Sequence, residues 1–194
     1  MRPRVSRFVS AVEPTRILTI SGSLRARSTN SALLDTAAQL RLPDVVLMRY
    51  QGIATLPHFD PDADREPLDP AVFDLRRQLH KSDALLVSTP EYAGALPGSF
   101  KNALDWMIGD DQPGSISEKP VAWINASIRE ARHAHDSLRL VLSYANAHIV
   151  EEACTHVPVR ESDIGPDGLI ANPDIVSATV ETITHLAAGV SPPR

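Results

Sequence analysis

From Thr15 onward, the sequence alternates between short apolar runs and segments whose apolar residues recur with the period of a helix. This alternation is typical of β-α-β units built around a parallel sheet. Because parallel strands are covered on both faces, they read as nearly continuous apolar runs. The pattern predicts five strands, at residues 16–21, 45–50, 84–88 and 120–126, with a weaker one at 149–150 or extending toward Val157.

Five helices are predicted between and after these strands. The first is capped by Ser28, Thr29 or Asn30, and the pairs Asp69-Pro70 and Asn172-Pro173 open the second and the last. The apolar stripes expected to face the core are Leu33, Leu34, Ala37 and Leu40, then Val72, Leu75 and Leu79, then Phe100, Ala103, Leu104, Met107 and Ile108, then Leu138, Val141, Leu142 and Ala145, then Val176, Val180, Ile183 and Ala187. Together the elements predict a three-layer α/β domain.

The length of 194 residues suits one domain. Residues 1–14 are expected to form a flexible extension, and residues 15–194 a single domain. Two long irregular stretches interrupt the alternation, at residues 51–69 and 157–171. Loops of this length are uncommon in a compact domain unless they shape a site or an interface.

Composition limits the partners and the compartment. A formal net charge of -5 argues against a surface built for nucleic acid, and no apolar stretch is long enough to span a membrane. Cys154 is the one cysteine, which excludes an internal disulfide and fits a reducing cytoplasm. The basic N-terminus lacks the apolar core of a secretion signal. We therefore expect a cytoplasmic protein.

The loop Ser21–Asn30 joins the first strand to the first helix and is rich in groups that donate hydrogen bonds to an anion. The donors are the hydroxyls of Ser23, Ser28 and Thr29, the Asn30 amide, the Arg25 guanidinium and the N-terminus of the helix. The loop matches neither a Walker A motif nor the G-x-G-x-x-G of dinucleotide folds. It is either a phosphate site or a long capped turn.

A second loop, Thr89–Gly98, follows the third strand and contains two prolines and two glycines. Tyr92 is a possible stacking ring, and Gly94 leaves its backbone open to close approach. The loop is either a tight connection or the wall of a site. In a sheet of order 2-1-3-4-5, both loops leave the carboxyl ends of adjacent strands at the topological switch point, where ligands bind. Together they predict a site for a phosphorylated planar molecule.

At these loops the chain resembles the NAD(P)H-dependent FMN reductases, flavodoxin-like proteins that include quinone, azo-dye and chromate reductases. The resemblance extends from Thr15 to Ala145. It rests on Gly22-Ser23-Leu24-Arg25 followed by Ser28 and Asn30, on Pro90-Glu91-Tyr92, and on Leu96-Pro97-Gly98-Ser99-Phe100-Lys101-Asn102-Ala103-Leu104-Asp105-Trp106. It implies a flavodoxin-like fold, bound FMN, and NADPH or NADH as electron donor.

The resemblance also implies roles for particular residues. Ser23, Arg25, Ser28 and Asn30 would hold the FMN phosphate, and the loop with Pro90, Glu91 and Tyr92 would lie along the isoalloxazine. In the family Asn usually follows Pro-Glu-Tyr, whereas this chain has Ala93, which leaves the backbone donors of Ala93 and Gly94. The family's loop after the fourth strand is typically rich in glycine and touches the flavin. Here it reads Asn125-Ala126-Ser127-Ile128-Arg129-Glu130-Ala131-Arg132, with Ser127 in the place of the first small polar residue.

The expected activity is an NAD(P)H oxidoreductase that passes hydride through FMN to a quinone or another small electrophile, with no protein group as general acid or base. Alternatives are a flavin reductase that supplies reduced FMN to a partner, and a flavodoxin-like electron carrier that is not an enzyme. The family resemblance further implies a homodimer or homotetramer. No metal site is expected, because His133 and His135 do not share a helix face and Cys154 fits a buried thiol better than a ligand.

Overall fold

Strand β1 (Thr15–Ser21) lies between two parallel neighbours, as its apolar run predicts. The computed structural model describes residues 13–190. Within them the sheet has the order β2-β1-β3-β4-β5, which confirms the predicted order 2-1-3-4-5. The other strands of this path are β2 (Val45–Tyr50), β3 (Ala84–Ser88), β4 (Pro120–Asn125) and β5 (His148–Ile149).

The register of β1 and β3 brings the two predicted loops together. Ser21, the last residue of β1, pairs with Ser88, the last residue of β3. The backbone N–H of Gly22 then donates to the Ser88 carbonyl at 2.8 Å. The loops that follow these strands therefore leave the same edge of the sheet side by side.

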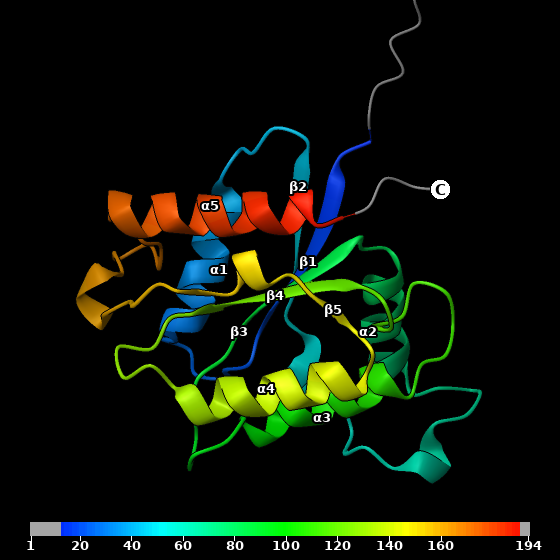
Figure 1. The fold of residues 1–194 in the computed structure, drawn as a ribbon. Coiled ribbons are helices and arrows are strands. Elements are labelled where there is room, and N and C mark those ends of the chain that lie inside the picture. The colour runs from blue at the N-terminus through cyan, green and yellow to red at the C-terminus, as the bar shows by residue number, and fades with distance from the viewer. Residues whose placement is uncertain (1–12, 191–194) are drawn as a thin grey trace, which may run out of the picture.

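Helices cover both faces of the sheet, as Figure 1 shows. Two of them pack with Ile17, Leu86 and Ile124 on one face. They are α1 (Thr29–Gln39) and α5 (Pro173–Ala188). The other three pack with Leu18, Val87 and Trp123 on the opposite face. They are α2 (Pro70–His80), α3 (Gly98–Ile108) and α4 (Arg132–Tyr144). This is the flavodoxin-like three-layer arrangement that was expected.

The last strand is divided into two short pieces on the outer side of β4. Strand β5 pairs with Pro120 and Val121, whereas β6 (Thr155–His156) pairs with Ile124 and Asn125. A 3-10 turn, η3 (Glu151–Ala153), separates the pieces. The weak signal between residue 149 and Val157 thus corresponds to two strands.

The buried face of α5 differs from the predicted one. The stripe Val176, Val180, Ile183 and Ala187 was expected to face the core, but of these only Ile183 is buried. The buried residues are Ile175, Thr179, Thr182, Ile183 and Leu186. The Thr179 hydroxyl donates to the Ile175 carbonyl at 2.7 Å, and the Thr182 hydroxyl to the Ala178 carbonyl at 3.0 Å. Because these hydroxyls are satisfied within the helix, the two threonines can occupy the core face.

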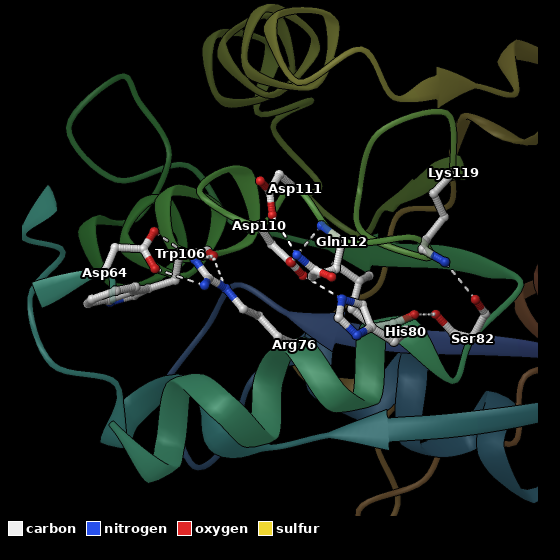
Figure 2. Close-up of polar contacts among 10 residues, drawn as sticks. Asp64, Arg76, His80, Ser82, Trp106, Asp110, Asp111, Gln112 and Lys119 are labelled. Carbon is white, nitrogen blue, oxygen red and sulfur yellow. Dashed lines mark hydrogen bonds and ion pairs between the residues drawn. The ribbon is translucent and has the colours of Figure 1, made fainter. Parts of the chain in front are cut away.

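The long stretch at residues 51–69 contains two 3-10 turns, η1 (Gly52–Thr55) and η2 (Pro61–Ala63), and is fixed to α2 and α3. The Pro57 carbonyl accepts hydrogen bonds from Asn102 and from the Trp106 indole, at 2.8 and 2.9 Å. Farther on, the Arg76 guanidinium joins the Asp64 carboxylate to the Trp106 carbonyl (Figure 2).

No helix within residues 13–190 is long and apolar enough to cross a membrane. The extension expected at residues 1–14 lies outside the described residues, except for Glu13 and Pro14.

Candidate functional site

A cavity of about 430 Å³ opens at the carboxyl ends of β1, β3 and β4. Most of the predicted site residues lie in its wall: Ser23, Arg25, Ser28, Thr29, Asn30, Pro90, Tyr92 and Ser127. The wall also contains residues that the sequence interpretation did not include: Ala126, Ile128, Val159, Arg160, Glu161 and Ser162. The switch point thus brings together four segments that are far apart in the sequence.

The first loop is organised by serine side chains. The Ser21 hydroxyl accepts from the Ser23 N–H at 3.2 Å and from the Ser31 hydroxyl at 3.0 Å. Ser28 is the N-cap of α1, and its Oγ accepts from the Ser31 N–H at 3.3 Å. The Ser23 Oγ accepts from the Arg25 N–H at 3.3 Å. These bonds hold the backbone in a defined curve around the N-terminus of the helix.

Several donors at this end of the cavity are available to an anion. Thr29 and Asn30 occupy the first turn of α1, where backbone N–H groups have no partner within the helix and the dipole is positive. Asn30 is buried, and its Oδ1 accepts from the Ser88 hydroxyl at 2.9 Å. This bond leaves the Nδ2 group of Asn30 for a ligand. Together with the hydroxyls and the Arg25 guanidinium, this donor set fits a phosphate.

The second loop contains a tight turn whose tip lies outside the cavity wall. Tyr92 and Ala95 exchange two backbone hydrogen bonds of 3.0 Å, and the residues between them, Ala93 and Gly94, have φ angles of 50° and 71°. Two positive φ angles define a type I′ turn, which favours Gly, Asn or Asp. The preference for Asn implied at position 93 by the family resemblance therefore has a backbone reason, which Ala93 does not meet.

Tyr92 joins the two loops. Its hydroxyl lies 3.5 Å from the Ser23 hydroxyl, and its ring is half-exposed along the cavity beside Pro90. A ring and a proline side by side offer a flat apolar surface for a planar ligand.

Glu91 does not line the cavity, and its side chain instead contacts the first turn of α4. Its carboxylate accepts a hydrogen bond from the Ala134 N–H in the first turn of α4, at 3.1 Å. The residue before this helix, Ala131, has no side-chain cap to offer. Glu91 therefore supplies the cap from another loop and ties the second loop to α4.

The third loop connects β4 to α4 and has left-handed backbone without glycine. Glu130 and Ala131 have φ angles of 66° and 48°. The side chain of Asn125 stabilises the loop by donating to the Glu130 carbonyl and accepting from the Ser127 N–H. Neither Arg129 nor Arg132 lines the cavity; both are exposed, and Arg132 lies 3.7 Å from the Glu130 carboxylate.

The fourth part of the wall comes from the second long irregular stretch, which carries the 3-10 turn η4 (Glu161–Asp163). Backbone hydrogen bonds from Val157 to Asn125 and from Val159 to Ala126 attach it to the end of β4. Its polar residues show no periodicity, so the signal in the sequence is the length of the stretch alone. Glu161 reaches across the cavity to Arg25, with 3.2 Å between the carboxylate and the guanidinium.

Other polar groups near the site do not form a reactive cluster. Burial raises the pKa of the Cys154 thiol to about 11, which keeps the thiol protonated at neutral pH. Burial lowers the pKa of His135, whose Nδ1 bonds to the Ala131 carbonyl at 2.8 Å. Within residues 13–190, no group of three or more metal-ligating side chains is placed to hold a metal ion.

The donor set and the flat wall fit the two ends of FMN. Hydroxyls, a guanidinium and the helix N-terminus suit the phosphate, and the surface of Pro90 and Tyr92 suits the isoalloxazine. The hydride-transfer chemistry would be supplied by the flavin, so these residues would only have to bind and orient it.

The family model described as NADPH-dependent FMN reductase matches residues 15–159. The NAD(P)H-dependent FMN reductase PA1204 of Pseudomonas aeruginosa is 37% identical over 136 residues, which are 69% of this chain and 72% of that protein. The 2-hydroxy-1,4-benzoquinone reductase of a Burkholderia species is 30% identical over 82% of this chain and 87% of that protein. A quinone reductase of Escherichia coli is 33% identical over 56% of this chain and 58% of its own length.

The structure of the flavoenzyme FerB, an NAD(P)H:(acceptor) oxidoreductase from Paracoccus denitrificans, is similar in fold, with a TM-score of 0.75. It is 22% identical, over 91% of this chain and 97% of that one. The resemblance seen in the sequence is thus confirmed by the family model and by the relatives. The chain belongs to the NADPH-dependent FMN reductase family and is an NAD(P)H-dependent oxidoreductase with FMN as its cofactor.

Proposed function

We propose that this enzyme reduces quinones or similar small electrophiles, with FMN held in the switch-point cavity. The observation that carries the proposal is the placement of phosphate donors around Arg25 and of the flat wall around Tyr92 in one cavity. Two relatives named as quinone and benzoquinone reductases support this class of acceptor.

The predicted site residues have distinct roles in this proposal. The phosphate group is held by Ser23, Arg25, Ser28, Thr29 and Asn30. Pro90, Tyr92 and Ser127 would hold the ring in the cavity, the backbone N–H groups of Ala93 and Gly94 would bind it from the turn beyond the wall, and Glu91 fixes the loop. Bound FMN would supply the chemistry of hydride transfer between NADPH or NADH and the acceptor. The protein binds and orients, and it contributes no general acid or base.

A second candidate activity is the supply of reduced FMN to a partner protein. The relative named as an FMN reductase favours it. An electron carrier that is not an enzyme fits the chain less well, because the curated relatives compared above are named as reductases.

A spectroscopic and kinetic experiment tests the proposal. The purified protein is mixed with FMN, freed of excess by gel filtration, and examined for flavin absorbance. Oxidation of NADPH and NADH is then followed with and without benzoquinone. We expect retained flavin and oxidation that accelerates with the quinone. Turnover that instead requires a large excess of free FMN favours the flavin reductase, and a protein that neither retains FMN nor oxidises NADPH or NADH when free FMN is added contradicts both activities.

The Arg25→Ala variant tests the phosphate end of the site. Loss of a charge-assisted hydrogen bond to the phosphate is expected to weaken FMN binding by about 1.5–3 kcal/mol. Unchanged FMN affinity would remove Arg25 from the phosphate site.

We also propose that copies of the chain assemble as a homodimer or homotetramer. An apolar groove of about 490 Å³ runs between α3 and α4, lined by Phe59, Lys101, Asp105, Ile108, Gly109, Leu140, Val141 and Tyr144. Leu140 is 74% and Tyr144 is 83% exposed, which is costly for large apolar side chains in a monomer. Lys101 and Asp105 belong to the stretch from Leu96 to Trp106 on which the family resemblance partly rests, and that resemblance implies a homodimer or homotetramer. Light scattering after gel filtration tests this, with Leu140→Asp expected to shift the protein toward the monomer.

We propose the cytoplasm as the compartment, because the one cysteine, Cys154, forms no disulfide within the chain.

A further inference from the structure

The ion pair between Arg25 and Glu161 spans the phosphate end of the cavity. It joins the loop after β1 to η4, across 136 residues of sequence, with a single contact of 3.2 Å between Nη2 and Oε1. The side chains are 64% and 61% exposed. An exposed pair of this kind contributes little stability, so a stronger anion can displace the carboxylate from the guanidinium.

Hydrogen bonds attach the segment that contains Glu161 to the sheet and close its turn. Val159 donates to the Ala126 carbonyl at 3.0 Å, which fixes the chain before η4 to the end of β4. The Arg160 N–H donates to the Asp163 carboxylate at 2.7 Å, which closes the turn. A carboxylate is therefore held beside the guanidinium that the proposed function gives to the phosphate.

Carboxylate and phosphate oxygens bind the same N–H groups of a guanidinium. Besides Arg25 and Glu161, the cavity wall contains one more charged side chain, Arg160. Within the described residues its guanidinium takes part in no ion pair. The wall thus offers two guanidinium groups to a phosphate dianion and places one carboxylate against the first of them.

We propose that Glu161 competes with the phosphate of FMN for Arg25 and thereby sets how readily the flavin exchanges with the free pool. This inference rests on the proposed function of the cavity. Glu161 lowers the affinity for the phosphorylated flavin specifically, because its effect acts at the phosphate end and leaves the ring wall at Tyr92 unchanged.

The test compares two ligands that differ only in the phosphate. FMN and riboflavin are titrated with wild-type protein and with Glu161→Gln, and binding is followed by flavin fluorescence. The variant is expected to bind FMN about two- to fivefold more tightly, the size of an exposed charge interaction, and riboflavin with unchanged affinity. The gain is expected to shrink as salt is added.

Glu181→Gln is the matched control, because it removes the same charge from an exposed position on α5 outside the cavity wall. It is expected to bind both flavins as the wild type does. In an Arg25→Ala background, Glu161→Gln is expected to lose its effect on FMN, since the group for which the two anions compete is gone.

Three results overturn the inference. They are an unchanged or weaker affinity of Glu161→Gln for FMN, an equal gain for riboflavin, and a gain that persists without Arg25. In each of these cases wild-type protein still binds FMN, so the proposed function stands. Wild-type protein that binds neither FMN nor riboflavin overturns the proposed function and this inference together.

Discussion

The Glu91 carboxylate accepts a hydrogen bond from the Ala134 N–H, 43 residues later in the chain, at a distance of 3.1 Å. It caps α4, whose preceding residue Ala131 has left-handed backbone and offers no capping side chain. A residue between two residues of the cavity wall, Pro90 and Tyr92, thus stabilises a helix on the face of the sheet that α2 and α3 cover.

Removal of this cap is expected to destabilise the fold. Glu91→Ala should lower the free energy of unfolding by about 1 kcal/mol, the usual cost of a lost N-cap. Glu91→Gln keeps an oxygen acceptor and should lose only the charge–dipole part, about 0.3–1 kcal/mol. Urea unfolding followed by circular dichroism measures both. Equal stability of Glu91→Ala and the wild type would show that the hydrogen bond contributes nothing.

Gly22 is the first residue of the loop after β1 and lies against Thr89, the first residue of the loop after β3. A Cβ at this position would lie 2.2 Å from the Thr89 hydroxyl and 2.7 Å from the Thr89 Cβ. Gly22→Ala should therefore cost about 1–3 kcal/mol through overpacking and should also weaken FMN binding.

Gly98→Ala is the matched control for this substitution, because a Cβ on Gly98 meets no atom within 4 Å. Gly98 is the first residue of α3, and alanine there should stabilise by about 0.4–1 kcal/mol. Thermal and urea unfolding of the two variants should move in opposite directions. A Gly22→Ala protein as stable as the wild type contradicts the close approach.

Ala93 is strained in its type I′ turn. Left-handed backbone costs a residue with a Cβ roughly 1–2 kcal/mol, and a substitution by glycine removes this cost. Part of that gain in stability is offset because glycine is more flexible than alanine in the unfolded chain. Ala93→Gly should therefore stabilise the protein by about 0.5–1 kcal/mol. Ala95→Gly, in the same turn without a positive φ, should destabilise it by a similar amount. The idea fails if both changes shift the urea midpoint in the same direction.

Lys119 links the stability of the fold to pH. It directly precedes β4, at the end of the sheet away from the cavity. Its ammonium donates to the Ser82 carbonyl at 2.6 Å (Figure 2), and burial lowers its pKa from 10.5 to about 8. Between these two pH values the unfolded chain keeps a proton that the folded protein has lost. Stability therefore rises as pH increases from about 8 to 10.5, and the penalty of the buried charge is present in full below this window.

Comparison with Lys119→Met isolates this contribution, since the variant has no proton to lose. The stability of the wild type relative to Lys119→Met should increase between pH 8 and 10 in urea unfolding experiments. Lys81→Met, which removes an exposed lysine nearby, should show no such trend. A flat or falling difference for Lys119→Met would contradict the burial of a charge.

The sequence predicts the fold well because the strands and helices carry separate periodicities. The apolar run of β3 indicates a buried parallel strand, and the stripe of α3 indicates a helix with one face in the core. The alternation of such strands and helices along the chain leaves few ways to build the sheet. On α5 the rule fails, because Thr179 and Thr182 satisfy their hydroxyls inside the helix and behave as core residues. Hydrophobic periodicity does not recognise such threonines.

The candidate site is predictable where its residues are close in sequence. Ser23 and Asn30 bracket one loop, and their donor chemistry can be recognised without a structure. Glu161 belongs to a segment with no pattern, and it reaches Arg25 only because β6 pairs with β4. The cap by Glu91 was also missed, since the need for it arises from the backbone of Ala131.

The division of the last strand has a consequence for how the molecule behaves at high concentration. Long unpaired edge strands are templates for aggregation through backbone pairing with another chain, and short edge strands block it. Strands β5 and β6 have two residues each and are separated by η3, so on that side no continuous ladder is exposed. Within residues 13–190, β2, with six residues paired to β1 alone, is therefore the edge through which sheets of neighbouring molecules could join.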